Sequence, residues 1–189
     1  MRSLWWQKAA AVVVAVGFAA CSGKLLSITV QDSSEVLIEK GTPLEVLVRD
    51  LGFGDFTDLD ISSREAITNQ GVEPGDISDV YFEELTLSVT EPTGGDLSFL
   101  KSLEFYVAAD GLPTILVASR YNFPEGVSSV EMILEDVDIV DYVVADSMDI
   151  TTEVTGSRPD ADTRVLGSFA LKVGATVQGA CNQAKGNKE

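Results

Sequence analysis

The sequence predicts an all-β protein, an antiparallel two-layer β-sandwich of immunoglobulin-like or jelly-roll-like type, with about eight or nine strands and one to three short helices. Apolar and polar residues alternate with period two along several segments, the pattern of strands with one exposed face. Turn-forming clusters of Gly, Pro and Asp separate these segments at short intervals. One-sided alternation favours antiparallel over parallel sheets, and a single hairpin cannot bury its own apolar face. The strands are therefore expected to stack as two sheets.

The alternation is clearest between Tyr81 and Thr90. It predicts a strand in which Tyr81, Leu85, Leu87 and Val89 share the buried face. The same pattern recurs from Met148 to Thr155 and from Val165 to Val173. Shorter candidate strands are Leu25–Val30, Ser34–Glu39, Leu44–Arg49, Ser102–Ala108, Thr114–Ser119 and Val130–Glu135.

Three short segments have helical character. Ser63–Gln70 follows the capping residues Asp60 and Ser62 and ends at a glycine. Leu97–Leu100 is long enough for one turn, and Asp138–Val144 spaces its apolar residues as a helix does. None of the three is long enough to change the fold class.

The N-terminus has the organisation of a secretory signal. Arg2 and Lys8 precede an apolar run of about 12 residues, Ala9 to Ala20. This run is too short for a bilayer-spanning helix, which needs roughly 17–25 residues. The following Phe18-Ala19-Ala20-Cys21 resembles the lipobox of bacterial lipoproteins. In that class a signal peptidase cleaves before the cysteine, which becomes the diacylglycerol-bearing, N-acylated first residue.

This resemblance covers only residues 1–22 and implies an address in the cell envelope. Residues 1–20 would be the signal peptide, 21–24 the lipidated N-terminus and tether, 25–178 a single sandwich domain and 179–189 a disordered polar tail. Ser22, where inner-membrane lipoproteins carry Asp, implies outer-membrane delivery in a cell with two membranes. The alternative is an ordinary cleaved signal, although such sites prefer a small residue where Phe18 stands.

The charge balance restricts the partners. Thirteen basic and 30 acidic residues give a net charge of −17, and loss of Arg2 and Lys8 with the signal peptide lowers it to −19. Nucleic acid and anionic headgroups both reward basic patches, so neither is expected to bind. The expected partners are the membrane, through the lipid anchor, and an envelope protein. If Cys21 is acylated, Cys181 has no internal disulfide partner and its role stays open.

The chain contains no histidine, which removes the usual nucleophile–base systems and the usual catalytic zinc sites. Ser98-Phe99-Leu100-Lys101 has the Ser-x-x-Lys spacing of serine acyl-transfer enzymes, but the companion motifs of those enzymes are absent. We therefore expect no catalytic residue and no cofactor. Carboxylates are plentiful, and Asp136, Asp138 and Asp141 form the best candidate calcium site, against the simpler interpretation of a solvated acidic rim.

Three function classes follow. The first, which demands least of the sequence, is a non-catalytic binding or structural module that exposes aromatic loop residues, either Phe53 and Phe56 or Tyr121 and Phe123. These pairs have an alternative interpretation as plugs over the core. The second is a carrier of lipid or another apolar ligand between the sheets. The third is a carboxylate-based hydrolase, which needs two convergent carboxylates in a cleft.

Overall fold

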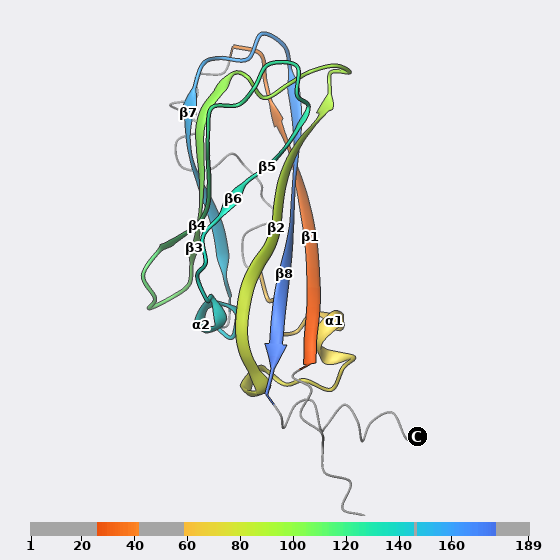
Figure 1. Ribbon diagram of the computed structural model, residues 1–189, viewed down its shortest axis with the longest axis vertical. Coiled ribbons are helices and arrows are strands. Elements are labelled where there is room, and N and C mark those ends of the chain that lie inside the picture. Colours follow the sequence, from red (N-terminus) through yellow and green to blue (C-terminus); the bar gives the residue numbers. More distant parts are fainter. Residues whose placement is uncertain (1–25, 42–58, 146, 177–189) are drawn as a thin grey trace, which may run out of the picture.

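The computed structural model describes residues 26–41, 59–145 and 147–176, and these form two antiparallel four-stranded sheets packed face to face (Figure 1). The predicted β-sandwich is thereby confirmed. Sheet I has the strand order β1-β8-β2-β5, and sheet II has the order β6-β4-β3-β7. The strands are β1 (Leu26–Ile38), β2 (Ile77–Glu91), β3 (Leu100–Ala108), β4 (Ile115–Tyr121), β5 (Ser129–Glu131), β6 (Ile133–Leu134), β7 (Asp149–Gly156) and β8 (Thr163–Ala175).

Strand β1 is one continuous strand of 13 residues that pairs with β8 along its full length, from Leu26 opposite Ala175 to Ile38 opposite Thr163. The prediction of two separate strands here was wrong, because Gln31-Asp32-Ser33 continues the ladder instead of turning. Asp32 is on the same face as the buried Val30, and its carboxylate is bound by the guanidinium of Arg64. The candidate strand Leu44–Arg49 lies outside the described residues.

Strand β2 contains a β-bulge that changes which side chains face the core. Its register against β8 shifts between Phe82 and Glu84, so one extra residue is inserted. Phe82 is buried before the bulge, and Leu85 and Leu87 are buried after it. Tyr81 therefore lies on the outer face, opposite Lys172, and the prediction that it shares a face with Leu85 was wrong.

One side of the sandwich is closed by a strand that crosses from one sheet to the other. The segment predicted as a single strand, Val130–Glu135, divides into β5 in sheet I and β6 in sheet II. The crossing occurs at Met132, whose side chain is buried and whose amide donates to the Leu85 carbonyl. Strands that change sheets are a known way to form the corner of a sandwich.

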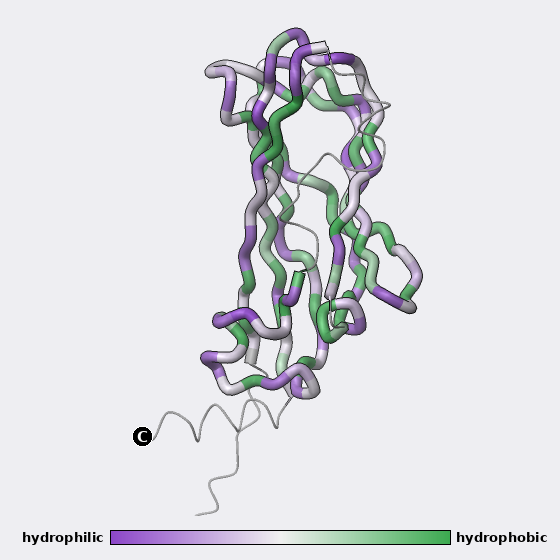
Figure 2. Tube along the Cα trace, turned by 180° about the vertical axis from the view of Figure 1, so that it is seen from behind, coloured by the Kyte–Doolittle hydropathy of each residue, from purple (hydrophilic) through white to green (hydrophobic). Residues whose placement is uncertain are grey.

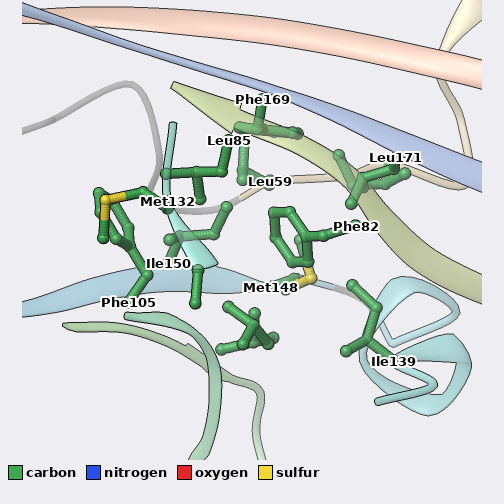
Figure 3. Close-up of a cluster of buried hydrophobic side chains, with 14 of the residues drawn as sticks. Leu59, Phe82, Leu85, Phe105, Met132, Ile139, Met148, Ile150, Phe169 and Leu171 are labelled. Carbon is green, nitrogen blue, oxygen red and sulfur yellow. The ribbon is translucent and has the colours of Figure 1, made fainter. Parts of the chain in front are cut away.

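The space between the sheets is filled by apolar side chains from both layers (Figure 3). The rings of Phe82 and Phe169 meet edge to face with their centroids 5.8 Å apart. Phe105 of sheet II and Leu87 of sheet I are both fully buried. Figure 2 shows hydrophobic and hydrophilic residues alternating along the long strands, as expected when each sheet has one face in the core.

The helices are short, as predicted. α1 (Glu65–Thr68) lies within the predicted segment 63–70, and α2 (Val140–Val143) within 138–144. A 3₁₀ turn, η3 (Pro74–Asp76), precedes β2, whereas Leu97–Leu100 forms a turn without a helix. In the described residues, none of the helices has the length and apolar character needed to cross a bilayer.

The two ends of the sandwich carry different parts of the chain (Figure 1). The lower end in that view carries α1, α2, the start of β1 and the end of β8. The opposite end carries the β2–β3, β4–β5 and β7–β8 connections. These connections contact one another, since Gly126 N donates to the Asp96 carboxylate and Ser157 N donates to the Phe99 carbonyl. We call this opposite end the loop end.

Candidate functional site: a tyrosine–carboxylate face on sheet II

Several predicted site residues lie outside the described residues, namely Cys21, Cys181, Phe53 and Phe56. Of the two aromatic pairs expected to form a contact patch, the structure therefore describes Tyr121 and Phe123. It separates them. The side chain of Tyr121 is 54% exposed, whereas Phe123 is 7% exposed and belongs to the hydrophobic core. Tyr121 is thus exposed, as the contact interpretation requires, whereas Phe123 fits the plug interpretation.

The candidate calcium ligands are not brought together as a site. Within the described residues, no group of three or more Asp, Glu, His or Cys side chains is arranged to hold a metal ion. Asp138 instead accepts hydrogen bonds from the backbone amides of Val80, at 2.9 Å, and Val140, at 3.0 Å. Strand β5 pairs with β2 only at residues 86–88, so this carboxylate takes the place of a ladder acceptor for the Val80 amide. Calcium binding by Asp136, Asp138 and Asp141 stays a prediction without an assembled ligand set.

The outer face of sheet II presents an ordered row of side chains around Tyr121. The strand registers place Ile133, Ser119, Glu104 and Glu153 side by side across β6, β4, β3 and β7. Ile133 is the most exposed large hydrophobic residue of the described chain, at 61%. Tyr121 lies in the next row toward the loop end and Tyr106 in the next row the other way. We call these six residues the tyrosine–carboxylate face.

Glu104 is at the centre of this face and binds both tyrosines. Its Oε1 accepts a hydrogen bond from the Tyr121 hydroxyl, and its Oε2 accepts one from the Tyr106 hydroxyl at 2.8 Å. The two phenols, Tyr121 first, lower the pKa of the Glu104 carboxyl because they stabilise its charged form. In return, the bond to Glu104 raises the pKa of Tyr121 and raises that of Tyr106 to about 12.

The face is acidic, and no Lys or Arg of the described residues forms an ion pair with it. Glu153 is directly opposite Glu104 in the ladder, and like charges in this position repel. The Glu135 carboxylate also contributes to the raised pKa of Tyr121, although less than the Glu104 hydrogen bond does. The ion pairs formed among the described residues join Arg64 to Asp32 and Arg164 to Glu35 and Glu91, all away from sheet II.

The residues considered for catalysis do not form a reactive arrangement. Ser98 and Lys101 are both exposed, so nothing desolvates the lysine as a general-base role requires. A surface pocket of about 240 Å³ at the loop end contains two carboxylates, Asp96 and Asp160. Hydrogen bonds from Ser98 and Gly126 lower the pKa of Asp96, which is the opposite of what a general acid needs.

Sequence alone indicated only part of this face. Glu104 and Tyr106 are two residues apart on a predicted strand, which places them on one side of the sheet. The sequence points to Tyr121 through its position in a predicted loop and gives no sign of its partner. Its bond to Glu104 depends on the β3–β4 register, and the position of Ile133 depends on the crossing at Met132.

Comparisons with known proteins do not assign this chain to a family. No protein-family model and no curated protein matches the sequence. Among solved structures, a chain from "Structure of Turnip Yellow Mosaic Virus at 100 K" is similar over 81% of this chain and 95% of its own length, with 10% identity and a TM-score of 0.31. A TM-score this low carries no argument about the function or the fold.

Proposed function

We propose that this chain is a lipoprotein of the bacterial cell envelope, anchored through an acylated Cys21, that works as a non-catalytic binding module. The observation that carries the proposal is the lipobox-like sequence 18–21, which ends five residues before strand β1 begins at Leu26. One acyl chain gives only marginal membrane binding, whereas the lipoprotein modification adds enough hydrocarbon for stable anchoring.

The position of β1 gives this anchor a geometric consequence. Five residues span at most about 17 Å, so the end of the sandwich with α1 and α2 would stay close to the bilayer. A strand of 13 residues is roughly 40 Å long. The loop end would then point away from the membrane, and the tyrosine–carboxylate face would lie between the two ends, accessible to a partner in the envelope.

The binding proposal is supported by the exposed Tyr121 and Ile133 on an ordered sheet face. The alternatives lack comparable support. A carrier needs an apolar cavity, but the described pockets are lined largely by polar residues, such as Gln31, Ser33 and Glu84 in a pocket of about 390 Å³ on sheet I. A hydrolase needs a carboxyl group with a raised pKa, and the shifts resolved at Asp60, Asp96 and Glu104 are all downward.

Labelling of the full-length chain with radioactive palmitate in a bacterial host tests the anchor. The wild type should incorporate label and lose residues 1–20, whereas Cys21→Ala should remain an unlabelled precursor. Cys181→Ala is the matched control, since it removes the only other cysteine and should be labelled and processed as the wild type is. Normal processing of Cys21→Ala would overturn the proposal.

A further inference from the structure

We propose that the tyrosine–carboxylate face of sheet II binds a positively charged, arginine-bearing segment of a partner protein. This inference rests on the proposed function as a binding module and names the chemistry of its partner. It combines three properties of the face, which are exposed apolar surface, negative charge that no described Lys or Arg neutralises, and aromatic rings held in fixed positions.

The exposed apolar surface lies on two neighbouring strands of sheet II, β4 and β6. Tyr121 and Ile133 belong to β4 and β6, and Ser119, the register partner of Ile133, is two residues from Tyr121. Ser119 itself is only 7% exposed. Large exposed apolar side chains that cluster, rather than scatter singly, mark contact surfaces.

The charge of the face selects the partner. Glu104 and Glu153 are directly opposed, and no Lys or Arg of the described chain is within ion-pair distance of either. A second copy of this chain has a net charge of −17, the same sign as the carboxylates of this face, and would be repelled. Nucleic acid and anionic lipid are repelled in the same way. A basic protein segment relieves the Glu104–Glu153 repulsion.

The tyrosines favour arginine over lysine. A guanidinium stacks on an aromatic ring and donates several hydrogen bonds in one plane. Each oxygen of Glu104 accepts one phenol and keeps further acceptor capacity for a guanidinium. Ile133 offers a surface for the aliphatic part of an arginine side chain. Because Glu104 already fixes both rings, binding costs little of their side-chain entropy.

Fluorescence anisotropy tests the proposal, with the processed, lipidated protein in a neutral detergent and fluorescein-labelled hexa-arginine, hexa-lysine and hexa-glutamate as probes. Hexa-arginine should bind more tightly than hexa-lysine, and hexa-glutamate should not bind. Tyr121→Ser should weaken hexa-arginine binding by about two- to fivefold, the size of one exposed cation–π contact. Glu153→Gln should weaken it by up to about fivefold, the size of one exposed ion pair. Tyr121→Phe, which keeps the ring, should lose less than Tyr121→Ser.

The matched control is Glu84→Gln, which removes one negative charge from sheet I and keeps an acceptor for the Thr86 hydroxyl. Its binding should stay close to that of the wild type. Equal weakening by Glu84→Gln and Glu153→Gln would overturn the proposal, because it would show general attraction to an acidic protein. Equal affinity for hexa-arginine and hexa-glutamate would overturn it too.

A carbodiimide cross-link locates the contact directly, since it joins a carboxylate to a lysine amine of hexa-lysine. Mass spectrometry should find the cross-link at Glu104, Glu135 or Glu153, and cross-links confined to other carboxylates would contradict the proposal. The same measurements on the Cys21→Ala chain separate the two proposals. Acylation and normal processing of Cys21→Ala, with hexa-arginine binding intact in both chains, would contradict only the anchor. Acylation that is lost in Cys21→Ala, with no hexa-arginine binding by either chain, would contradict only this inference.

Discussion

Tyr121 and Phe123 lie two residues apart and point to opposite sides of sheet II. Residues with this spacing in a regular strand share a face. Here Asn122 between them adopts a φ of 63°, in the left-handed region, which turns the chain at the end of β4. Asn tolerates this conformation better than other residues with a Cβ. The turn directs Tyr121 toward Glu104 and Phe123 into the core.

This separation predicts unequal effects of two similar truncations. Phe123→Ala should lower the free energy of unfolding by about 3–5 kcal/mol, because it leaves a cavity in the core. Tyr121→Ala should cost only about 0.5–1.5 kcal/mol, the net value of its hydrogen bond. Urea denaturation of both variants measures the difference. A Tyr121→Ala cost equal to that of Phe123→Ala would contradict the assignment of Tyr121 to the outer face.

The bond between Tyr106 and Glu104 predicts an alkaline titration above the ordinary range. The Tyr106 pKa is raised to about 12 from the usual 10.0. Its stabilising contribution is therefore complete below pH 10 and is lost as the pH rises through about 12. Absorbance near 295 nm should show this late titration, and Glu104→Gln should move it back toward pH 10. An unchanged titration in that variant would show that Glu104 is not the cause.

The hydrogen bonds that Glu104 accepts from Tyr121 and Tyr106 have an effect at acid pH with the opposite sign. The Glu104 pKa is lowered, so the stability that its carboxylate provides is present above its usual pKa and is lost as the pH falls through the lower, folded value. The difference in unfolding free energy between the wild type and Glu104→Gln should therefore shrink on acidification. A difference that stays constant from neutral to strongly acid pH would contradict this link.

Asp138 is predicted to act as a backbone cap. Asp138→Ala removes the acceptor of the Val80 and Val140 amides and should cost about 1–3 kcal/mol, because the Val80 amide is left without its partner. Asp138→Asn keeps an oxygen at this position and should cost less. Thermal unfolding with calcium and then with chelator, on the wild type and both variants, also tests the calcium hypothesis. A calcium-dependent midpoint that Asp138→Asn abolishes would favour a metal site over the cap.

Two glycines are expected to respond differently to alanine. A Cβ at Gly95 would lie 2.9 Å from the backbone oxygen of Pro92, so Gly95→Ala must shift the β2–β3 connection and should cost about 1–3 kcal/mol. A Cβ at Gly75 meets nothing within 4 Å, and Gly75→Ala should be neutral or stabilise by up to about 1 kcal/mol. Thermal unfolding distinguishes them, and equal midpoints would contradict the tight approach at Gly95.

The fold class could be predicted because the alternation of apolar and polar residues is clear along the long strands, above all along β8. In β8 the buried residues Val165, Phe169, Leu171 and Val173 follow period two without a break. The same reasoning failed at Tyr81, because a bulge adds one residue and leaves no local sequence signal. It also failed at Asp32, a charge on the inward side of β1 whose partner, Arg64, is 32 residues away.

The candidate site was harder to predict, because it depends on pairing between strands. The turn at Asn122 decides the direction of Phe123, and asparagine has many roles in loops. Glu104 and Tyr121 are 17 residues apart, and only the β3–β4 register brings them together. Alternation within one strand gives the face of a residue, but not its neighbour in the next strand.

The pairing of β1 with β8 also determines how the protein would respond to mechanical force. β1 and β8 are antiparallel along 13 residues, and their hydrogen bonds run perpendicular to the strands. If a lipid holds the chain just before Leu26 while a partner pulls on the loop end, the load acts along β1. All rungs of this ladder would then be sheared at once instead of opening one after another, so the attachment of the tether would resist such a load through the whole length of the β1–β8 pairing.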